Sequence, residues 1–196
     1  ETGTEYYEYV LVYTDDLLCI STNPMQILAC LDQHYMLKPG SIGKPTQYLG
    51  AQIGEYRFPD EPEKVRWSLS SEKYVKEAIR NVQNWLADNN MKPLKTRASS
   101  VLPSGYRPEM DATDYCNEEL ANYYQQQIGV LRWAVELGRI NICAEVSMLA
   151  AYTAAPRLGH FDAMLHVFSF LHHHPRSRLV FDDRYFDHIE KPVEHD

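Results

Sequence analysis

The sequence predicts an α+β fold with antiparallel strands near its start and helices in its second half. Three observations lead to this prediction. Two strand-like segments, residues 9–13 and 17–22, are rich in β-branched and aromatic residues and are joined by a short acidic turn. An amphipathic helix is predicted over about residues 71–87, where apolar residues recur at helical spacing. Further helices are predicted over about residues 118–137, 141–154 and 159–172.

A helix and a second strand pair are predicted to follow the first hairpin. Asn23-Pro24 fits a helix start, because proline is favoured at the first helical position. The apolar stripe behind it continues to a helix end near residues 38–40. Residues 48–54 predict a short strand that pairs with residues 65–69 across a polar loop at 59–64.

The spacing of apolar residues predicts which of the remaining segments are helices and which are connectors. The helix predicted over residues 71–87 buries an apolar side, and Lys73, Lys76 and Arg80 share a different face. Residues 92–114 contain three prolines and no sustained period, which predicts a connector. Residues 178–181 end the ordered pattern with a short strand.

Composition and charge exclude several classes of protein. The chain has 196 residues, of which 44% are hydrophobic and 23% charged, so wholesale disorder is excluded. Its apolar runs are far shorter than the roughly 20 residues of a membrane-spanning helix. The formal net charge of −8 argues against a nucleic-acid partner for the chain as a whole. Residues 51–100 alone are positive, with nine cationic and seven acidic side chains.

The four cysteines are widely spaced and include no C-x-x-C pair, so neither a zinc site nor a disulfide framework is predicted. Because no secretory segment precedes them, we expect reduced thiols and a cytoplasmic or nuclear location.

Two adjacent carboxylates, Asp15 and Asp16, stand between the first two strands. An Asp-Asp pair is also ordinary turn chemistry, and the dipeptide alone favours that interpretation. Carboxylates this close repel each other unless a cation neutralises them, and hard oxygen ligands suit Mg²⁺. Polymerases use paired magnesium ions held in this way.

The residues around this pair, and a series of later motifs, resemble the reverse transcriptases of copia-type long-terminal-repeat retrotransposons. The segment Tyr-Thr-Asp-Asp at positions 13–16 is similar to the family's Y-x-D-D hairpin, and Tyr48-Leu49-Gly50 is similar to its primer-grip strand. Residues 67–75 and 124–133 resemble its thumb segments, and residues 138–149 and 156–171 resemble the motifs that follow. The series runs in the family's order from about residue 9 to residue 182.

The resemblance implies a fold and a set of roles. It implies the later part of a palm, followed by a helix-rich thumb and connection region, and an RNA-directed DNA polymerase that uses Mg²⁺, an RNA/DNA template-primer and dNTPs. Asp15 and Asp16 correspond to the motif's metal-binding catalytic carboxylates. Tyr13, Leu49 and Gly50 correspond to primer-binding positions. The phosphate backbone would contact three cations of the thumb helix, Lys73, Lys76 and Arg80. A solvated charged face beside an apolar stripe is an interpretation at least as strong.

The resemblance also implies a division of the chain into segments. We expect palm residues over 1–58, a thumb hairpin, helix and connector over 59–115, a helical thumb and connection over 116–182, and an acidic tail over 183–196.

Departures from the family pattern predict that this chain alone does not polymerise. The fingers and the palm strand that bears the other metal-binding aspartate have no counterpart here, and only Glu1, Glu5 and Glu8 precede the motif as acids. Gln125 occupies a usual arginine position, and His172-His173-His174 replaces a basic turn. We expect the uncovered palm strands to associate with a missing palm and fingers half or with themselves.

A second hypothesis is a decayed or co-opted retroelement remnant that acts as a non-catalytic binding module. The acidic net charge and the lost basic positions favour it. A metal site at the adjacent histidines 172–174 is not favoured, because consecutive helical residues point about 100° apart.

Overall fold

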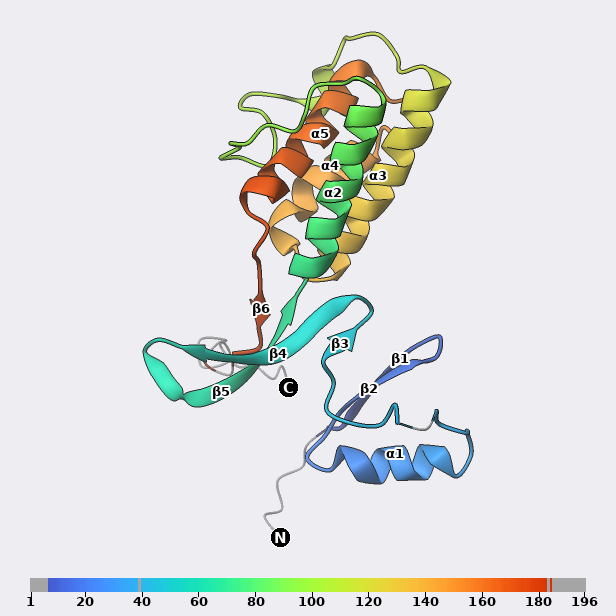
Figure 1. Cartoon of the computed structure of the whole chain (residues 1–196), viewed down its shortest axis with the longest axis vertical. Helices are drawn as coiled ribbons and strands as arrows, with labels where there is room; N and C mark the ends of the chain where they lie inside the picture. The colour runs from blue at the N-terminus through green and yellow to red at the C-terminus, as the bar shows by residue number, and fades with distance from the viewer. Residues whose placement is uncertain (1–6, 39, 183, 185–196) are drawn as a thin grey trace, which may run out of the picture. The chain divides into compact units, whose positions relative to one another are not determined.

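The computed structural model describes residues 7–38, 40–182 and 184, which fall into two compact units, Glu1–Leu49 and Gly50–Asp196. Figure 1 shows helices and antiparallel strands, so the predicted α+β class is confirmed. The division between the units lies nine residues before the boundary predicted at 58/59. The segments predicted over 59–115 and 116–182 belong to one unit, and the predicted tail lies outside the described residues except for Arg184.

The first unit contains β1 (Tyr9–Tyr13), β2 (Asp16–Ile20), α1 (Pro24–Asp32) and the short β3 (Gln47–Tyr48). Strands β1 and β2 form the predicted hairpin, in antiparallel register from Tyr9 opposite Ile20 to Tyr13 opposite Asp16. None of the described residues up to Leu49 is buried, and all five residues of β1 are exposed. The described part of this unit therefore lacks a hydrophobic core of its own.

Helix α1 starts where it was predicted, with Asn23 as its N-cap residue and Pro24 in its first turn. It ends at Asp32, before the predicted end near residues 38–40. The Asp32 carboxylate accepts a hydrogen bond of 3.1 Å from the backbone amide of Leu37, which turns the chain back just beyond the helix. Because the stripe residues Ile27, Leu28 and Leu31 are only half-buried, the stripe gains too little packing energy to extend the helix.

The sheet of the second unit consists of β4 (Ala51–Phe58), β5 (Glu61–Ser70) and β6 (Leu179–Val180), all antiparallel to their neighbours. Only Pro59 and Asp60 separate β4 from β5, so the loop predicted over residues 59–64 is a tight two-residue turn. The polar residues of that predicted loop form the exposed start of β5.

Helices form the rest of the second unit and pack side by side beyond the sheet (Figure 1). They are α2 (Glu72–Asp88), α3 (Glu118–Glu136), α4 (Cys143–Ala150) and α5 (Leu158–His173). Two 3-10 turns, Pro108–Met110 and Ile140–Ile142, lie between them. The second of these turns precedes α4, which is therefore shorter than the helix predicted over residues 141–154.

The core of the second unit is built where the apolar stripes of these helices meet. Helix α2 contributes the predicted stripe Val75, Ile79, Val82 and Leu86, all buried. The ring of Trp85 stacks on that of Tyr123 from α3, with centroids 3.7 Å apart and planes 11° apart. Every buried residue of the described chain lies between Ala51 and Leu171.

Candidate functional site

The candidate site suggested by the sequence is the tip of the β1–β2 hairpin. Thr14 and Asp15 form a two-residue connection between Tyr13 and Asp16, which are paired across the strands. Thr14 has a φ of 54°. Tight hairpin turns need a positive φ at their first position, but a β-branched residue adopts it only at a steric cost. The backbone of this turn is therefore strained at the residue that precedes the two aspartates.

The carboxylates of Asp15 and Asp16 are both exposed at this tip. Mg²⁺ is commonly held by one or two protein carboxylates, with water and phosphate oxygens as its other ligands. The two aspartates fit that donor set. Over residues 7–38, 40–182 and 184, histidine, cysteine and acidic side chains do not gather in any group of three that could hold a metal ion.

The residues predicted to contact the primer lie at strand ends. Tyr13 ends β1 and is 51% exposed. Leu49 and Gly50 separate β3 from β4 and have φ values of 52° and 93°. A side chain added to Gly50 would place its Cβ 3.8 Å from Cδ1 of Leu137, which is ordinary contact, so backbone conformation is what requires glycine there.

The three cations predicted to bind phosphates all lie exposed on α2. Two of them have acidic partners on the same helix. The Lys76 ammonium lies 2.6 Å from the Glu72 carboxylate, and the Arg80 guanidinium lies 3.1 Å from the Glu77 carboxylate. The Glu72 pKa is lowered mainly by its hydrogen bond from Lys76. Lys73 has no ion pair within the described part of the chain, which leaves it as the cation best able to bind a phosphate.

The histidines do not form a metal centre among the described residues. Both ring nitrogens of the buried His160 are engaged, with the Arg157 amide at 3.1 Å from Nδ1 and the Pro108 carbonyl at 2.9 Å from Nε2. His160 therefore joins the start of α5 to the connector before α3.

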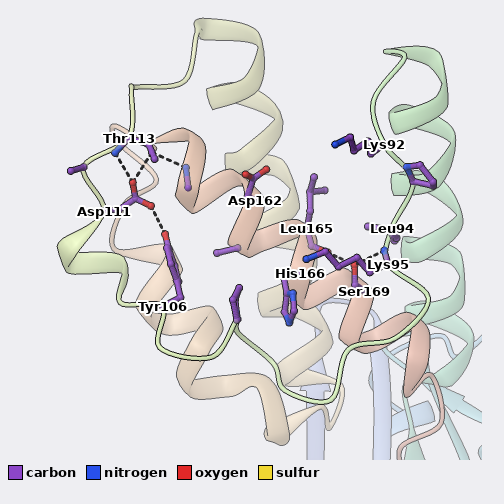
Figure 2. Close-up of a pocket in the computed structure, with 15 residues that line it drawn as sticks. Lys92, Leu94, Lys95, Tyr106, Asp111, Thr113, Asp162, Leu165, His166 and Ser169 are labelled. Carbon is purple, nitrogen blue, oxygen red and sulfur yellow. Dashed lines mark hydrogen bonds between the residues drawn. The ribbon is translucent and has the colours of Figure 1, made fainter.

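A cavity of about 580 Å³ lies in the second unit, between α5 and the connector. Figure 2 shows Asp111 as the centre of a hydrogen-bond network at one end of it. Its carboxylate accepts hydrogen bonds from the Tyr106 hydroxyl at 2.7 Å and from the amide and hydroxyl of Thr113 at 2.9 and 2.6 Å. Burial opposes ionisation, but these hydrogen bonds prevail and the Asp111 pKa is lowered.

The other wall of this cavity carries Lys92, Lys95, Asp162, His166 and Ser169 (Figure 2). The Ser169 hydroxyl donates to the Leu165 carbonyl at 2.9 Å and accepts from the Lys95 amide at 3.1 Å. Burial lowers the His166 pKa, and its Nε2 lies 3.1 Å from the Ser100 carbonyl. The Ser169 hydroxyl is engaged by backbone groups on both sides, whereas His166 Nδ1 is buried with no hydrogen-bond partner among the described residues, so these two side chains do not form a nucleophile–base pair.

Sequence reasoning did not find two features of the second unit. One is the contact between Asp111 and Gly159, since a Cβ added to that glycine would overlap the Asp111 carboxylate. The other is Arg139, a guanidinium that is 1% exposed and donates to the His174 carbonyl at 2.9 Å. The sequence signal for the first feature was Gly159, which precedes His160, and the signal for the second was Arg139, which stands in an apolar stretch. Neither signal identifies the distant residue that the side chain or backbone contacts in the fold.

Comparisons of the chain with protein-family models, with curated proteins and with solved structures found no match. The resemblance to copia-type reverse transcriptases therefore rests on the sequence motifs. Within the described ranges, every helix is too short or too polar to cross a lipid bilayer.

Proposed function

We propose that the chain is a segment of an RNA-directed DNA polymerase of the copia retrotransposon type. The observation that carries this proposal is the hairpin tip at residues 13–16. Its sequence resembles the family's Y-x-D-D motif, and the chain there forms a two-residue turn between antiparallel strands with both carboxylates exposed. The positive φ of Thr14 is strain of the kind that persists at functional sites.

In this proposal three residues of the hairpin tip, and two residues that follow β3, have roles in catalysis or primer binding. Asp15 is the principal metal ligand and Asp16 the less direct one, as the resemblance implies. These two carboxylates would hold Mg²⁺, which when bound would supply Lewis-acid activation of a primer hydroxyl and neutralise negative charge on the leaving pyrophosphate. Tyr13 supports the primer terminus, and Leu49 and Gly50 contact the primer strand.

The partners that follow are an RNA/DNA template-primer, dNTPs and the other parts of a polymerase. All four cysteines are free thiols, which suits a reducing compartment, the cytoplasm or the nucleus.

The first test measures metal binding at the hairpin tip with Mn²⁺ as a paramagnetic substitute for Mg²⁺. We expect the full chain to bind Mn²⁺ weakly, and Asp15→Asn and Asp16→Asn each to reduce the enhancement of water proton relaxation. Asp88→Asn is the matched control, because it removes an exposed carboxylate at the end of α2. Equal loss in all three variants would contradict a metal site at the hairpin.

The second test measures binding of an RNA–DNA primer-template at increasing salt concentration. Phosphate contacts release counterions, so we expect an affinity that falls steeply with salt. Lys73→Glu should weaken binding by about tenfold, because it reverses the charge of the α2 cation with no ion-pair partner in the described chain. Lys92→Glu makes the same charge change beyond the end of α2 and should have a smaller effect.

A primer-extension assay tests whether the chain is sufficient for catalysis. We expect no dNTP incorporation, because no third acidic residue joins Asp15 and Asp16 among the described residues. Incorporation by the purified chain that Asp15→Asn abolishes would overturn this expectation while supporting the polymerase assignment.

A second candidate function is a non-catalytic binding module derived from such a polymerase. The ion pairs on α2 favour it, because Glu72 and Glu77 neutralise two of the three cations that would face a phosphate backbone. Absence of primer-template binding at low salt, together with Mn²⁺ binding unaffected by Asp15→Asn, would favour this candidate over the first.

A further inference from the structure

Strand β1 is an unusually apolar and uncharged edge strand. Its residues Tyr9-Val10-Leu11-Val12-Tyr13 are between 40% and 64% exposed. Among the described residues β1 pairs with β2 alone, in a two-stranded sheet. Natural edge strands are normally protected by charged residues, proline, bulges or a covering element, and β1 itself contains no charge, proline or register shift.

The sequence of β1 is the same in both directions around Leu11. In an antiparallel pair of two such strands centred on Leu11, each tyrosine lies opposite a tyrosine and each valine opposite a valine. Aromatic and β-branched cross-strand pairs are among those that stabilise a sheet most. A strand of this kind is therefore complementary to itself.

The backbone of the hairpin fits the same register. The residues that flank a two-residue hairpin turn exchange their backbone hydrogen bonds, and this pattern alternates along the strand. Since Tyr13 is opposite Asp16, residues 9, 11 and 13 direct their backbone groups toward β2. Val10 and Val12 then direct theirs to the outer edge. Pairing centred on Leu11 sets Val10 of one chain opposite Val12 of the other, so the groups that face outward meet each other.

We propose that two copies of this chain associate through β1, in antiparallel register about Leu11, to form a continuous four-stranded sheet in the order β2-β1-β1-β2. The contact is isologous, because both chains contribute the same outer edge of β1. After pairing, neither β1 edge is left to bind a third chain, so the assembly closes as a dimer. It also covers apolar residues of a unit in which no described residue is buried. The proposal is independent of any catalytic role of Asp15 and Asp16.

Charged substitutions at the symmetry axis test both the contact and its register. Sedimentation equilibrium of the full chain should show a concentration-dependent dimer of about twice 22.7 kDa. Leu11→Lys and Leu11→Glu each place like charges directly opposite one another and should each weaken the dimer by about tenfold or more. An equimolar mixture of the two variants should restore dimers, because a lysine then faces a glutamate.

Two controls separate this contact from other causes. Met36→Lys adds the same charge at a residue of the same unit that is 98% exposed, and it should leave the dimer unchanged. Far-ultraviolet circular dichroism should show the same helix content in all variants, since the helical core lies in the other unit.

Three results would overturn the proposal. They are a monomer at all concentrations, open-ended assembly of the parent chain, and a mixture of Leu11→Lys and Leu11→Glu that dimerises no better than either variant alone.

Salt gives an independent check, because Glu8 and the two aspartates place acidic groups at both ends of the paired strands. Added salt should strengthen the dimer by screening them, and weakening would contradict the proposed register.

Discussion

The absence of a Cβ atom at Gly159 makes room for the hydrogen-bond network of the Asp111 carboxylate. The Asp111 carboxylate occupies the space where a Cβ of residue 159 would lie, and the Gly159 amide donates to the Thr113 hydroxyl at 2.9 Å. Because three hydrogen bonds from Tyr106 and Thr113 hold that carboxylate, it can move aside only by breaking them.

We therefore expect Gly159→Ala to lower the free energy of unfolding by about 1–3 kcal/mol, as overpacked sites do. Gly129→Ala is the matched control. Gly129 lies inside α3 with nothing within 4 Å of its added Cβ, so alanine should raise stability by about 0.5–1 kcal/mol. Urea unfolding of both variants measures the difference, and equal effects would contradict the tight contact at Gly159.

The neighbours Tyr123 and Tyr124 are both buried but differ at their hydroxyl groups. The Tyr124 hydroxyl donates to the Leu149 carbonyl at 2.7 Å, whereas the Tyr123 hydroxyl is buried with no hydrogen-bond partner among the described residues. Burial raises the Tyr123 pKa to about 12.

This raised pKa predicts a loss of stability in alkali. Below the unfolded-state pKa of about 10, Tyr123 is protonated in both states and has no effect on the pH dependence of stability. Above it, the unfolded chain releases a proton that the folded chain retains, so Tyr123 lowers stability by up to about 1.4 kcal/mol per pH unit until the folded pKa is reached.

Tyr123→Phe should remove this part of the alkaline loss and leave stability at neutral pH almost unchanged. Tyr124→Phe should instead cost about 0.5–1.5 kcal/mol at neutral pH, because it removes a buried hydrogen bond and leaves the Leu149 carbonyl with its bond from the Tyr152 amide. Denaturant titrations at neutral and alkaline pH measure both effects. An unchanged alkaline slope in Tyr123→Phe would contradict the assigned pKa.

At the scale of whole elements, Arg139 joins the ends of two helices. It follows α3, and its Nη1 donates to the carbonyl of His174, the C-cap residue of α5. A cation is favourable at a helix C-terminus, but burial lowers the Arg139 pKa, and its Nε and Nη2 have no hydrogen-bond partner among the described residues.

We expect Arg139→Met to change the free energy of unfolding by less than about 1 kcal/mol, because the lost hydrogen bond is offset by relief of a buried charge. Arg139→Ala should cost about 2–5 kcal/mol, because it leaves a cavity. Thermal and urea unfolding compare the two variants. If methionine is as damaging as alanine, the guanidinium itself supports the helix ends.

The elements that could be predicted from the sequence are those whose apolar side meets a core. Helix α2 lies within one residue of its predicted bounds, because its stripe packs against α3 and α5. Helix α1 has a similar stripe but no buried residue, and its predicted end is wrong. Periodicity indicates what a helix can bury, and only the surrounding structure decides whether it does.

Some features of the candidate sites could likewise be predicted from the sequence, and others could not. The turn at residues 13–16 is a local feature, so the β-branched and aromatic residues on either side of the acidic pair predicted the hairpin correctly. The ion pairs of Lys76 and Arg80 were also within reach, since Glu72 and Glu77 stand four and three positions before them. The contact between Asp111 and Gly159 joins segments far apart in the chain, and no local pattern predicts it.

At the scale of the whole molecule, the two units differ in what stabilises them. The second unit contains every buried residue of the described chain, and the first contains none. We therefore expect amides of β1, β2 and α1 to exchange with deuterium orders of magnitude faster than amides of α2, α3 and α5.

Hydrogen exchange followed by mass spectrometry measures this difference at concentrations where the chain is monomeric. Peptides from residues 9–32 should lose protection well before peptides from residues 75–86, and equal protection would show that one cooperative unit spans both. Leu86→Ala, at a buried core position, should accelerate exchange in α3 and α5 and leave the hairpin unchanged.

The lack of buried residues before Ala51 has a consequence for how this chain evolves. In the second unit, substitutions are restrained by packing whatever the protein does. In the hairpin unit that restraint is absent, so mutation can remove Asp15 or Asp16 at little cost to folding. Among descendants of this gene, persistence of both aspartates would therefore measure selection on their chemistry, and their early loss would mark a lineage that has ceased to need it.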